Sequence, residues 1–182
     1  MIIGTNTPAI VTGGACGLGA ATARVLAEHG APVTILDSNI AAGTRIAGDI
    51  GGLFRNADVT DAAAIDAAIA AGAEAHGPAR IVVNCAGIAP AARSVGRDGT
   101  PHDPDIFARV IGINLIGTFL VASRGAAAMA PLDRISVDGE RGVIINAASI
   151  AAFEGQIGQI AYAASKAGVA GMTLPMARDL AS

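Results

Sequence analysis

Short runs of apolar, largely β-branched residues alternate along the chain with longer alanine-rich stretches. Five of these runs predict β-strands, at residues 9–12, 32–37, 53–59, 80–87 and 142–149. Most of their positions are apolar, without the alternation of polar residues that marks a half-exposed strand. The strands are therefore expected to be buried on both faces, as in a parallel sheet.

The stretches between these strands predict helices. They cover residues 17–29, about 40–50, 61–77, 105–129 and 159 to the end. Alternating strands and helices with right-handed crossovers give a Rossmann-type doubly wound parallel sheet, an α/β fold with three α/β/α layers. The polar stretches 93–104 and 131–141 are predicted to be loops within one domain that spans residues 1–182.

Composition narrows the classes of partner. Apolar residues make up 52% of the chain and charged residues 15%, which is typical of a globular domain. A formal net charge of −3 offers no basic footprint for nucleic acid or for an anionic membrane surface. No uninterrupted apolar run reaches membrane-spanning length, so no membrane partner is expected.

The remaining reactive residue types are sparse. Cys16 and Cys85 are predicted to be free thiols in a reducing compartment, and a cytoplasmic location is expected because the first strand begins too early for a signal peptide. The three histidines have no ligand-like spacing, so no metal site is predicted.

A glycine-rich segment, "TGGACGLG" at 12–19, joins the first strand to the first helix. Glycines there let the backbone approach a pyrophosphate, which the helix N-terminus attracts. Asp37 ends the second strand, where a carboxylate can accept hydrogen bonds from both ribose hydroxyls and repel a 2′-phosphate. The pattern favours NAD over NADP. A turn used only for packing, or a nucleotide-binding methyltransferase, could share these features.

The second half of the chain separates these alternatives. Tyr162 is the only tyrosine, and Lys166 follows it by one helical turn, on the same helix face. A free phenol has a pKa of roughly 10, and one ammonium about 4 Å away supplies about the 4 kcal/mol needed to lower that pKa to about 7. Ser149, at the end of the fifth strand, can hydrogen-bond a substrate oxygen. These three side chains suit proton exchange coupled to hydride transfer.

The motifs together resemble the short-chain dehydrogenase/reductase family. In order, they are "TGGACGLG", "ADV" at 57–59, "NCAG" at 84–87, Asn114 in "INLIGTF", Ser149, and "YAASK" at 162–166. Within the family, residues 141–181 resemble the type-2 3-hydroxyacyl-CoA dehydrogenases, also called 17β-hydroxysteroid dehydrogenases type 10.

This resemblance implies roles for particular residues. Tyr162 would be the general acid and base, Ser149 would polarise the substrate oxygen, and Lys166 would lower the pKa of the phenol and bind the nicotinamide ribose. Asn114 would hold a water that links Lys166 to solvent. The substrate contacts would be Ser149, Gln156 and Gln159. The cofactor contacts would be Gly13, Cys16, Gly17, Leu18, Gly19, Asp37, Asp58, Val59, Asn84, Ala86, Gly87, Tyr162 and Lys166.

The implied reaction is reversible, NAD-dependent oxidation of a secondary alcohol in a 3-hydroxyacyl-CoA or a hydroxysteroid. The chain is shorter than members of this family usually are, so the last strands and the substrate lid are expected to be absent and the fifth strand to form an edge. A homo-oligomer through helices 105–129 and 159–181 is expected. A non-catalytic nucleotide-binding or assembly module stays open as an alternative.

Overall fold

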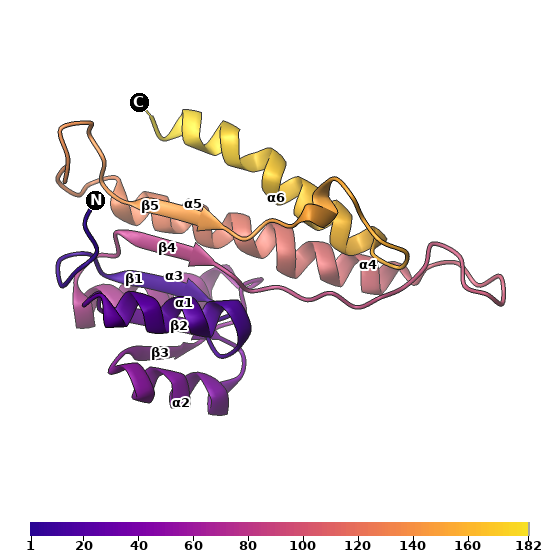
Figure 1. The fold of residues 1–182 in the computed structure, drawn as a ribbon, viewed down its shortest axis with the longest axis horizontal. Helices are drawn as coiled ribbons and strands as arrows, with labels where there is room; N and C mark the ends of the chain where they lie inside the picture. Colours follow the sequence, from indigo (N-terminus) through magenta and orange to yellow (C-terminus); the bar gives the residue numbers. More distant parts are fainter. Residues whose placement is uncertain (182) are drawn as a thin grey trace.

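The computed structural model describes residues 1–181, and its centre is one sheet of five parallel strands (Figure 1). The strands are β1 (Ala9–Thr12), β2 (Val33–Asp37), β3 (Leu53–Asn56), β4 (Ile81–Asn84) and β5 (Val143–Asn146). Their order in the sheet is β3-β2-β1-β4-β5. The direction of winding reverses at β1, and ligands of such sheets bind beside that point, at the carboxyl ends of the strands. The predicted doubly wound sheet is confirmed.

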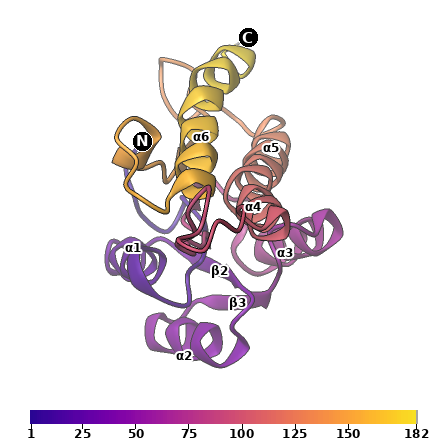
Figure 2. The ribbon, with the colours of Figure 1, turned by 90° about the vertical axis from the view of Figure 1, so that its right-hand side faces the viewer.

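Helices cover both faces of the sheet. They are α1 (Gly17–Glu28), α2 (Ile40–Ile50), α3 (Ala62–His76), α4 (Pro104–Ile111), the π-helical η1 (Gly112–Gly117), α5 (Thr118–Met129), the 3₁₀ turn η2 (Ile150–Ala152) and α6 (Ile160–Asp179). Figure 2 shows α1 and α2 on one side of the sheet and α3 and α5 on the other. Helix α6 packs along α4 and η1. The arrangement gives the three predicted layers.

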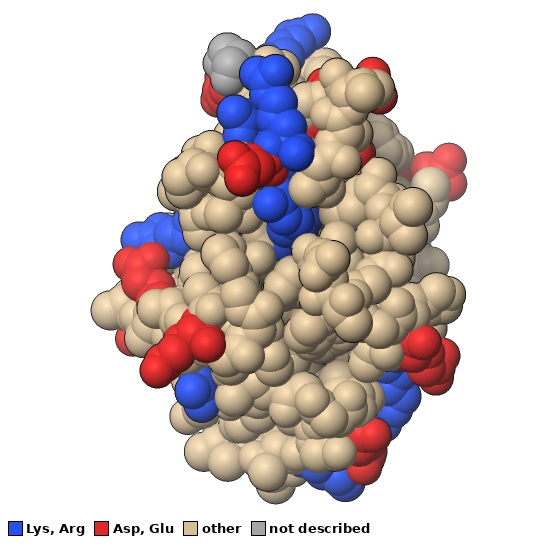
Figure 3. Space-filling view, turned by 90° about the vertical axis from the view of Figure 1, so that its left-hand side faces the viewer, with Lys and Arg blue, Asp and Glu red and all other residues tan. Residues whose placement is uncertain are grey.

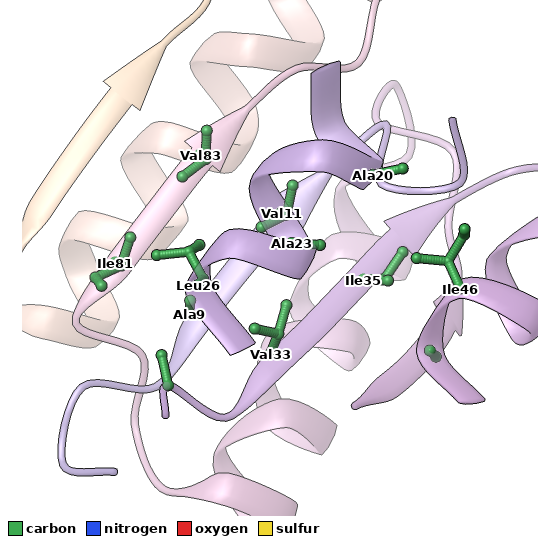
Figure 4. Close-up of a cluster of buried hydrophobic side chains, with 12 residues drawn as sticks. Ala9, Val11, Ala20, Ala23, Leu26, Val33, Ile35, Ile46, Ile81 and Val83 are labelled. Carbon is green, nitrogen blue, oxygen red and sulfur yellow. The ribbon is translucent and has the colours of Figure 1, made fainter. Parts of the chain in front are cut away.

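Two hydrophobic cores lie on opposite faces of the sheet because successive strand side chains point to opposite sides. In β1, Val11 joins the core beneath α1 and α2, while Ile10 joins the core beneath α3 and α5. Figure 4 shows the first core, in which Ile46 of α2 lies beside Ile35 of β2, and Leu26 of α1 faces the strands. These cores hold the carboxyl ends of β1, β2 and β4 in fixed relative positions.

Three predicted strands end earlier than expected. The third run, predicted to extend to residue 59, leaves the sheet after Asn56, the fourth, predicted to extend to 87, leaves it after Asn84, and the fifth, predicted to extend to 149, leaves it after Asn146. Side chains close to these ends bond within turns: Asp58 accepts the Thr60 N–H at 2.9 Å. The residues after each strand are therefore loop residues at the carboxyl edge of the sheet.

The helical run from Pro104 to Met129 is long and apolar enough, by length and composition, to cross a membrane. This differs from the expectation that no segment reaches that length. Within the fold the run contacts α3, β4, β5 and α6, and Arg124 forms an ion pair with Asp66 of α3 at 2.8 Å. Part of its apolar surface therefore lies in the second core, through Val121 and Met129.

Strand β5 forms one edge of the sheet, as expected, and Ile145 is half-exposed there. A cavity of about 550 Å³ lies beside it, between the end of α5, β5 and the last turns of α6. On the face that Figure 3 shows, a narrow band of Lys and Arg is interrupted by acidic side chains, and most of the remaining surface is uncharged. That face presents no extended field of one sign.

Candidate active site

The turn between β1 and α1 packs directly on the segment that follows β4. Gly13 has a φ of +65°, and a Cβ added there would lie 2.7 Å from the backbone nitrogen of Ala86. A Cβ on Gly19 would overlap the carbonyl oxygen of Gly13. Cys16, the N-cap of α1, makes no side-chain bond to the helix, so the first-turn amides are left available. The turn has the close backbone approach and the donors that an anion requires.

A cleft of about 490 Å³ opens beside this turn. Ten of the thirteen residues predicted to contact the cofactor line it: Gly13, Cys16, Gly17, Leu18, Gly19, Asp37, Asp58, Val59, Ala86 and Gly87. Ala57 and Cys85, which belong to the motifs at 57–59 and 84–87, line it as well, and the cleft also includes residues that the motifs did not indicate: Leu36, Ser38, Ile88, Arg109 and Ile113. Arg109 could not have been singled out, because only the path of α4 beside the cleft brings it there.

Asp37 is tied to the turn as well as to its own loop. Its Oδ2 accepts the Ala15 N–H at 3.0 Å, and its Oδ1 accepts the Asn39 N–H at 2.9 Å. The carboxylate therefore stays at the end of β2 and at the edge of the cleft. A fixed anion at that position can accept the two hydroxyls of a ribose.

Asn84 lies inside the sheet and does not line the cleft. It is 2% exposed, and its Nδ2 donates to Asn146 Oδ1 at 2.9 Å across the β4–β5 pair. Thr12 aligns with Asn84 across the β1–β4 pair, so three polar residues form a row at the strand ends. Thr12 opens the glycine-rich motif at 12–19 but received no role in the motif analysis, and Asn146 was missed. The sequence feature that could have identified both is a polar residue at the last position of an otherwise apolar strand.

Lys166 is 6% exposed, and its Nζ donates to the carbonyl oxygen of Ala147 at 2.6 Å, just beyond β5. Burial lowers the pKa of this ammonium, and the nearby Cys85 opposes that shift. The Nζ lies 5.7 Å from the centroid of the Tyr162 ring. One turn of α6 has thus placed the buried ammonium beside the half-buried ring of Tyr162.

Asn114 connects the cleft to α6. It is fully buried in η1, where its Oδ1 accepts the Ile88 N–H at 2.8 Å. A Cβ added to Gly87, which lines the cleft, would lie 3.2 Å from Asn114 Oδ1 and 3.9 Å from Lys166 Nζ. The cleft wall, the amide and the ammonium are therefore immediate neighbours.

Ser149 follows β5 by three residues and is the N-cap of η2, which packs against α6. Its Oγ accepts the Ala151 N–H at 3.1 Å. Gln156 and Gln159 line a separate cavity of about 410 Å³, between their loop and the start of the extended loop 89–103 (Figure 1). The Gln159 Oε1 accepts the Gln156 N–H at 3.0 Å, so this amide also shapes its own loop.

The two cysteines provide a test of the cleft. Cys16 is exposed, whereas burial raises the pKa of the Cys85 thiol despite the opposing effect of Lys166. The thiolate is the reactive form. With iodoacetamide at pH 7 we therefore expect Cys16 to react first and Cys85 to react more slowly, with the Cys85 rate rising as the pH is raised.

Mass spectrometry of the single-cysteine variants Cys16→Ser and Cys85→Ser would follow each rate. ADP-ribose should slow both reactions, because both cysteines line the cleft. A Cys85 thiol that reacts at pH 7 as fast as Cys16 would contradict this description of the cleft.

A sequence profile described as short chain dehydrogenase matches residues 7–182. The chain belongs to this family of dehydrogenases. It is 45% identical over 180 residues to 3-hydroxyacyl-CoA dehydrogenase type-2 of Drosophila melanogaster, covering 97% of this chain and 70% of that one. It is 46% identical over 176 residues to the protein of the same name from Homo sapiens, covering 95% and 67%.

A crystal structure of 3-hydroxyacyl-CoA dehydrogenase type-2 from Mycobacterium avium is similar throughout the chain. Its TM-score is 0.90 at 42% identity, and the match covers 97% of this chain and 70% of that one. The chain is therefore an oxidoreductase of the short-chain dehydrogenase family that is related to 3-hydroxyacyl-CoA dehydrogenase type-2. The resemblance drawn from the motifs is confirmed.

Proposed function

We propose that the chain binds NAD and reversibly oxidises a secondary alcohol, with Ser149, Tyr162, Lys166 and Asn114 as the proton-transfer site. The observation that carries the proposal is the position of Gly87. This residue lines the nucleotide cleft, and the space beside its Cα borders both Asn114 and Lys166. A ligand seated in the cleft would therefore end next to the Tyr162–Lys166 pair.

The residues of the cleft fit a dinucleotide. Gly13 and Gly19 leave a cradle that a Cβ would fill, and the first amides of α1 face that turn. Those donors suit a pyrophosphate, Asp37 suits the adenosine ribose, and Asp58 with Val59 would border the adenine. NAD, when bound, would supply the hydride acceptor.

The chain's own residues would then manage the proton. In the direction of oxidation, the Tyr162 phenolate takes the proton of the alcohol O–H while the carbinol carbon gives up a hydride, which leaves a carbonyl. Ser149 donates to the same substrate oxygen and holds it toward the phenol. The Lys166 ammonium would stabilise the phenolate, and a water held beside Asn114 would link that ammonium to solvent, so that the proton can leave the site.

The loop beyond β5 supports an apolar substrate. Phe153 and Ile157 are 82% and 80% exposed, and they flank the segment that carries Gln156. Arg93 lines the adjoining cavity of about 410 Å³. An apolar surface next to a cation suits a 3-hydroxyacyl-CoA, and a hydroxysteroid would use the apolar part alone.

Cofactor choice can be tested at Asp37. We expect wild-type protein to bind NAD and to bind NADP much more weakly, because the carboxylate repels a 2′-phosphate. Asp37→Ser should lower NAD affinity about tenfold, since two ribose hydrogen bonds are lost. It should also lower the ratio of NAD affinity to NADP affinity. Calorimetric titration with both cofactors would measure this, with Asp49→Ser on the surface of α2 as a control. Equal affinity for NAD and NADP in the wild type would contradict the assignment.

Turnover separates catalysis from binding alone. NADH absorbance should rise when the protein is mixed with NAD and 3-hydroxybutyryl-CoA, or with NAD and a hydroxysteroid. NAD binding without turnover on either substrate would instead support a non-catalytic nucleotide-binding module.

We also propose a homo-oligomer formed through the helical run Pro104–Met129 and α6. In that run Ile116 and Phe119 are each 49% exposed, and Leu174 of α6 is 57% exposed. Burying these apolar side chains between two copies would remove them from water. Size-exclusion chromatography with light scattering should show a dimer or larger, and Phe119→Glu should shift it toward the monomer. A wild-type monomer at high concentration would contradict the proposal.

A further inference from the structure

Ser165 is a fully buried hydroxyl in α6, directly before Lys166 and three residues after Tyr162. Its Oγ donates to the carbonyl oxygen of Tyr162 at 2.7 Å and accepts from Asn114 Nδ2 at 3.1 Å. A serine hydroxyl has one proton to donate, so the first bond leaves its lone pairs to receive the amide. The two bonds join the helix of the Tyr162–Lys166 pair to η1.

The side chain of Asn114 is fully engaged. Its Nδ2 donates to the Ile88 carbonyl oxygen at 2.9 Å as well as to Ser165, and its Oδ1 accepts the Ile88 N–H. The two bonds to Ile88 determine which amide atom is oxygen. A continuous row of hydrogen bonds therefore runs from the cleft wall at Ile88, through Asn114 and Ser165, to the backbone of Tyr162.

This row links α6 to the wall of the cleft. Asn114 Oδ1 and Lys166 Nζ border the same point beside Gly87, and Ser165 is the side chain that joins the Asn114 amide to α6. We propose that Ser165 is a positioning residue, which holds the cleft wall and Asn114 in register with the phenol and ammonium of α6. This role rests on the proposed function, and it adds a residue that contacts neither the cleft nor the substrate loop.

The sole tyrosine provides a readout that needs neither cofactor nor turnover. The chain has one Tyr and no Trp, so the phenolate absorbance near 295 nm reports on Tyr162 alone. Ser165→Ala leaves one N–H of Asn114 without its buried partner, and α6 loses this side-chain hydrogen bond to η1. We expect the midpoint of the phenolate signal to move to higher pH, because the ammonium is then held less closely to the phenol.

In the active enzyme, Ser165→Ala should lower kcat about three- to tenfold, the effect of one buried hydrogen bond, with a smaller change in KM. Thr173→Val is the matched control, since the Thr173 hydroxyl donates to the Val169 carbonyl on the same helix at 2.9 Å, away from Asn114. It should change neither the midpoint nor kcat. Ser165→Thr keeps a hydroxyl, so its phenolate midpoint and its kcat should be closer to the wild-type values than those of Ser165→Ala.

Two results would overturn the role. One is a folded Ser165→Ala protein with the wild-type midpoint and kcat, and the other is an equal effect in Thr173→Val. Should Ser165→Ala fail to fold, Ser165→Cys, whose thiol bonds weakly, should give a smaller shift in the same direction, and no shift would count against the role. Absence of turnover in the wild type would defeat the proposed function only, because the absorbance titration still reads the position of the phenol.

Discussion

Tyr162→Phe should reduce turnover by about 10²–10⁴-fold, the range that a positioned general acid or base contributes. The substitution removes one oxygen and keeps the ring, which is half-buried at the start of α6. Nothing else in the site gains or loses a charge, so NAD affinity should change less than about twofold. Steady-state kinetics with NAD and 3-hydroxybutyryl-CoA, or with a hydroxysteroid, would measure the first effect and calorimetry the second.

The outcome that contradicts the role of Tyr162 is a variant that keeps more than about one tenth of the wild-type kcat. In that case another group would be exchanging the proton. A fall in kcat accompanied by an equal fall in NAD affinity would instead indicate that the phenol shapes the cleft.

Gly19→Ala should have the largest effect on nucleotide binding. The new methyl group would overlap the Gly13 carbonyl oxygen, which is backbone and cannot rotate away. The β1–α1 turn must then shift, and we expect NAD affinity to fall about 100-fold. Overpacking of this kind costs about 1–3 kcal/mol, which corresponds to about 3–10 °C in Tm for a chain of this size.

Gly48→Ala is the control for this substitution. Gly48 lies in α2, is exposed, and has open space where a Cβ would be placed. Alanine there should leave NAD affinity unchanged and raise stability by about 0.5–1 kcal/mol, because glycine is the poorer helix former. Calorimetry and thermal unfolding would compare the two variants, and unchanged NAD affinity in Gly19→Ala would show that the turn does not hold the cofactor.

Local patterns were enough to predict the sheet and the nucleotide turn. Apolar strands such as 9–12 admit only a buried parallel arrangement, and glycines at Gly13 and Gly19 mark a close backbone approach. Asp61 and Asn39 also cap the helices that follow them, through bonds to amides two or three residues ahead. All of these features depend on residues that are near one another in the sequence.

The features that were missed depend on distant partners. Asn84 was expected to line the cleft, but Asn146, 62 residues later, draws its side chain into the sheet. The π-helical turn at Asn114 interrupts a helix that was predicted to be regular, and its side chain bonds to Ile88 and Ser165, 26 and 51 residues away. Pairings over such separations are set by the tertiary fold, and no local pattern in the sequence specifies them.

The Tyr162–Lys166 pair combines both kinds of information. Helical spacing predicts that the two side chains share a face, but it does not predict that Lys166 bonds to Ala147 beyond β5. That bond places the ammonium under the carboxyl edge of the sheet. Because Lys166 is buried there, fewer water molecules screen its charge.

A pH titration of the phenolate absorbance, comparing wild type with Lys166→Met, tests most directly whether a buried ammonium activates the only phenol in the chain. The midpoint in Lys166→Met should lie at a higher pH than in the wild type, because the cation that favours the phenolate is gone. Equal midpoints in the two proteins would contradict the proposed chemistry.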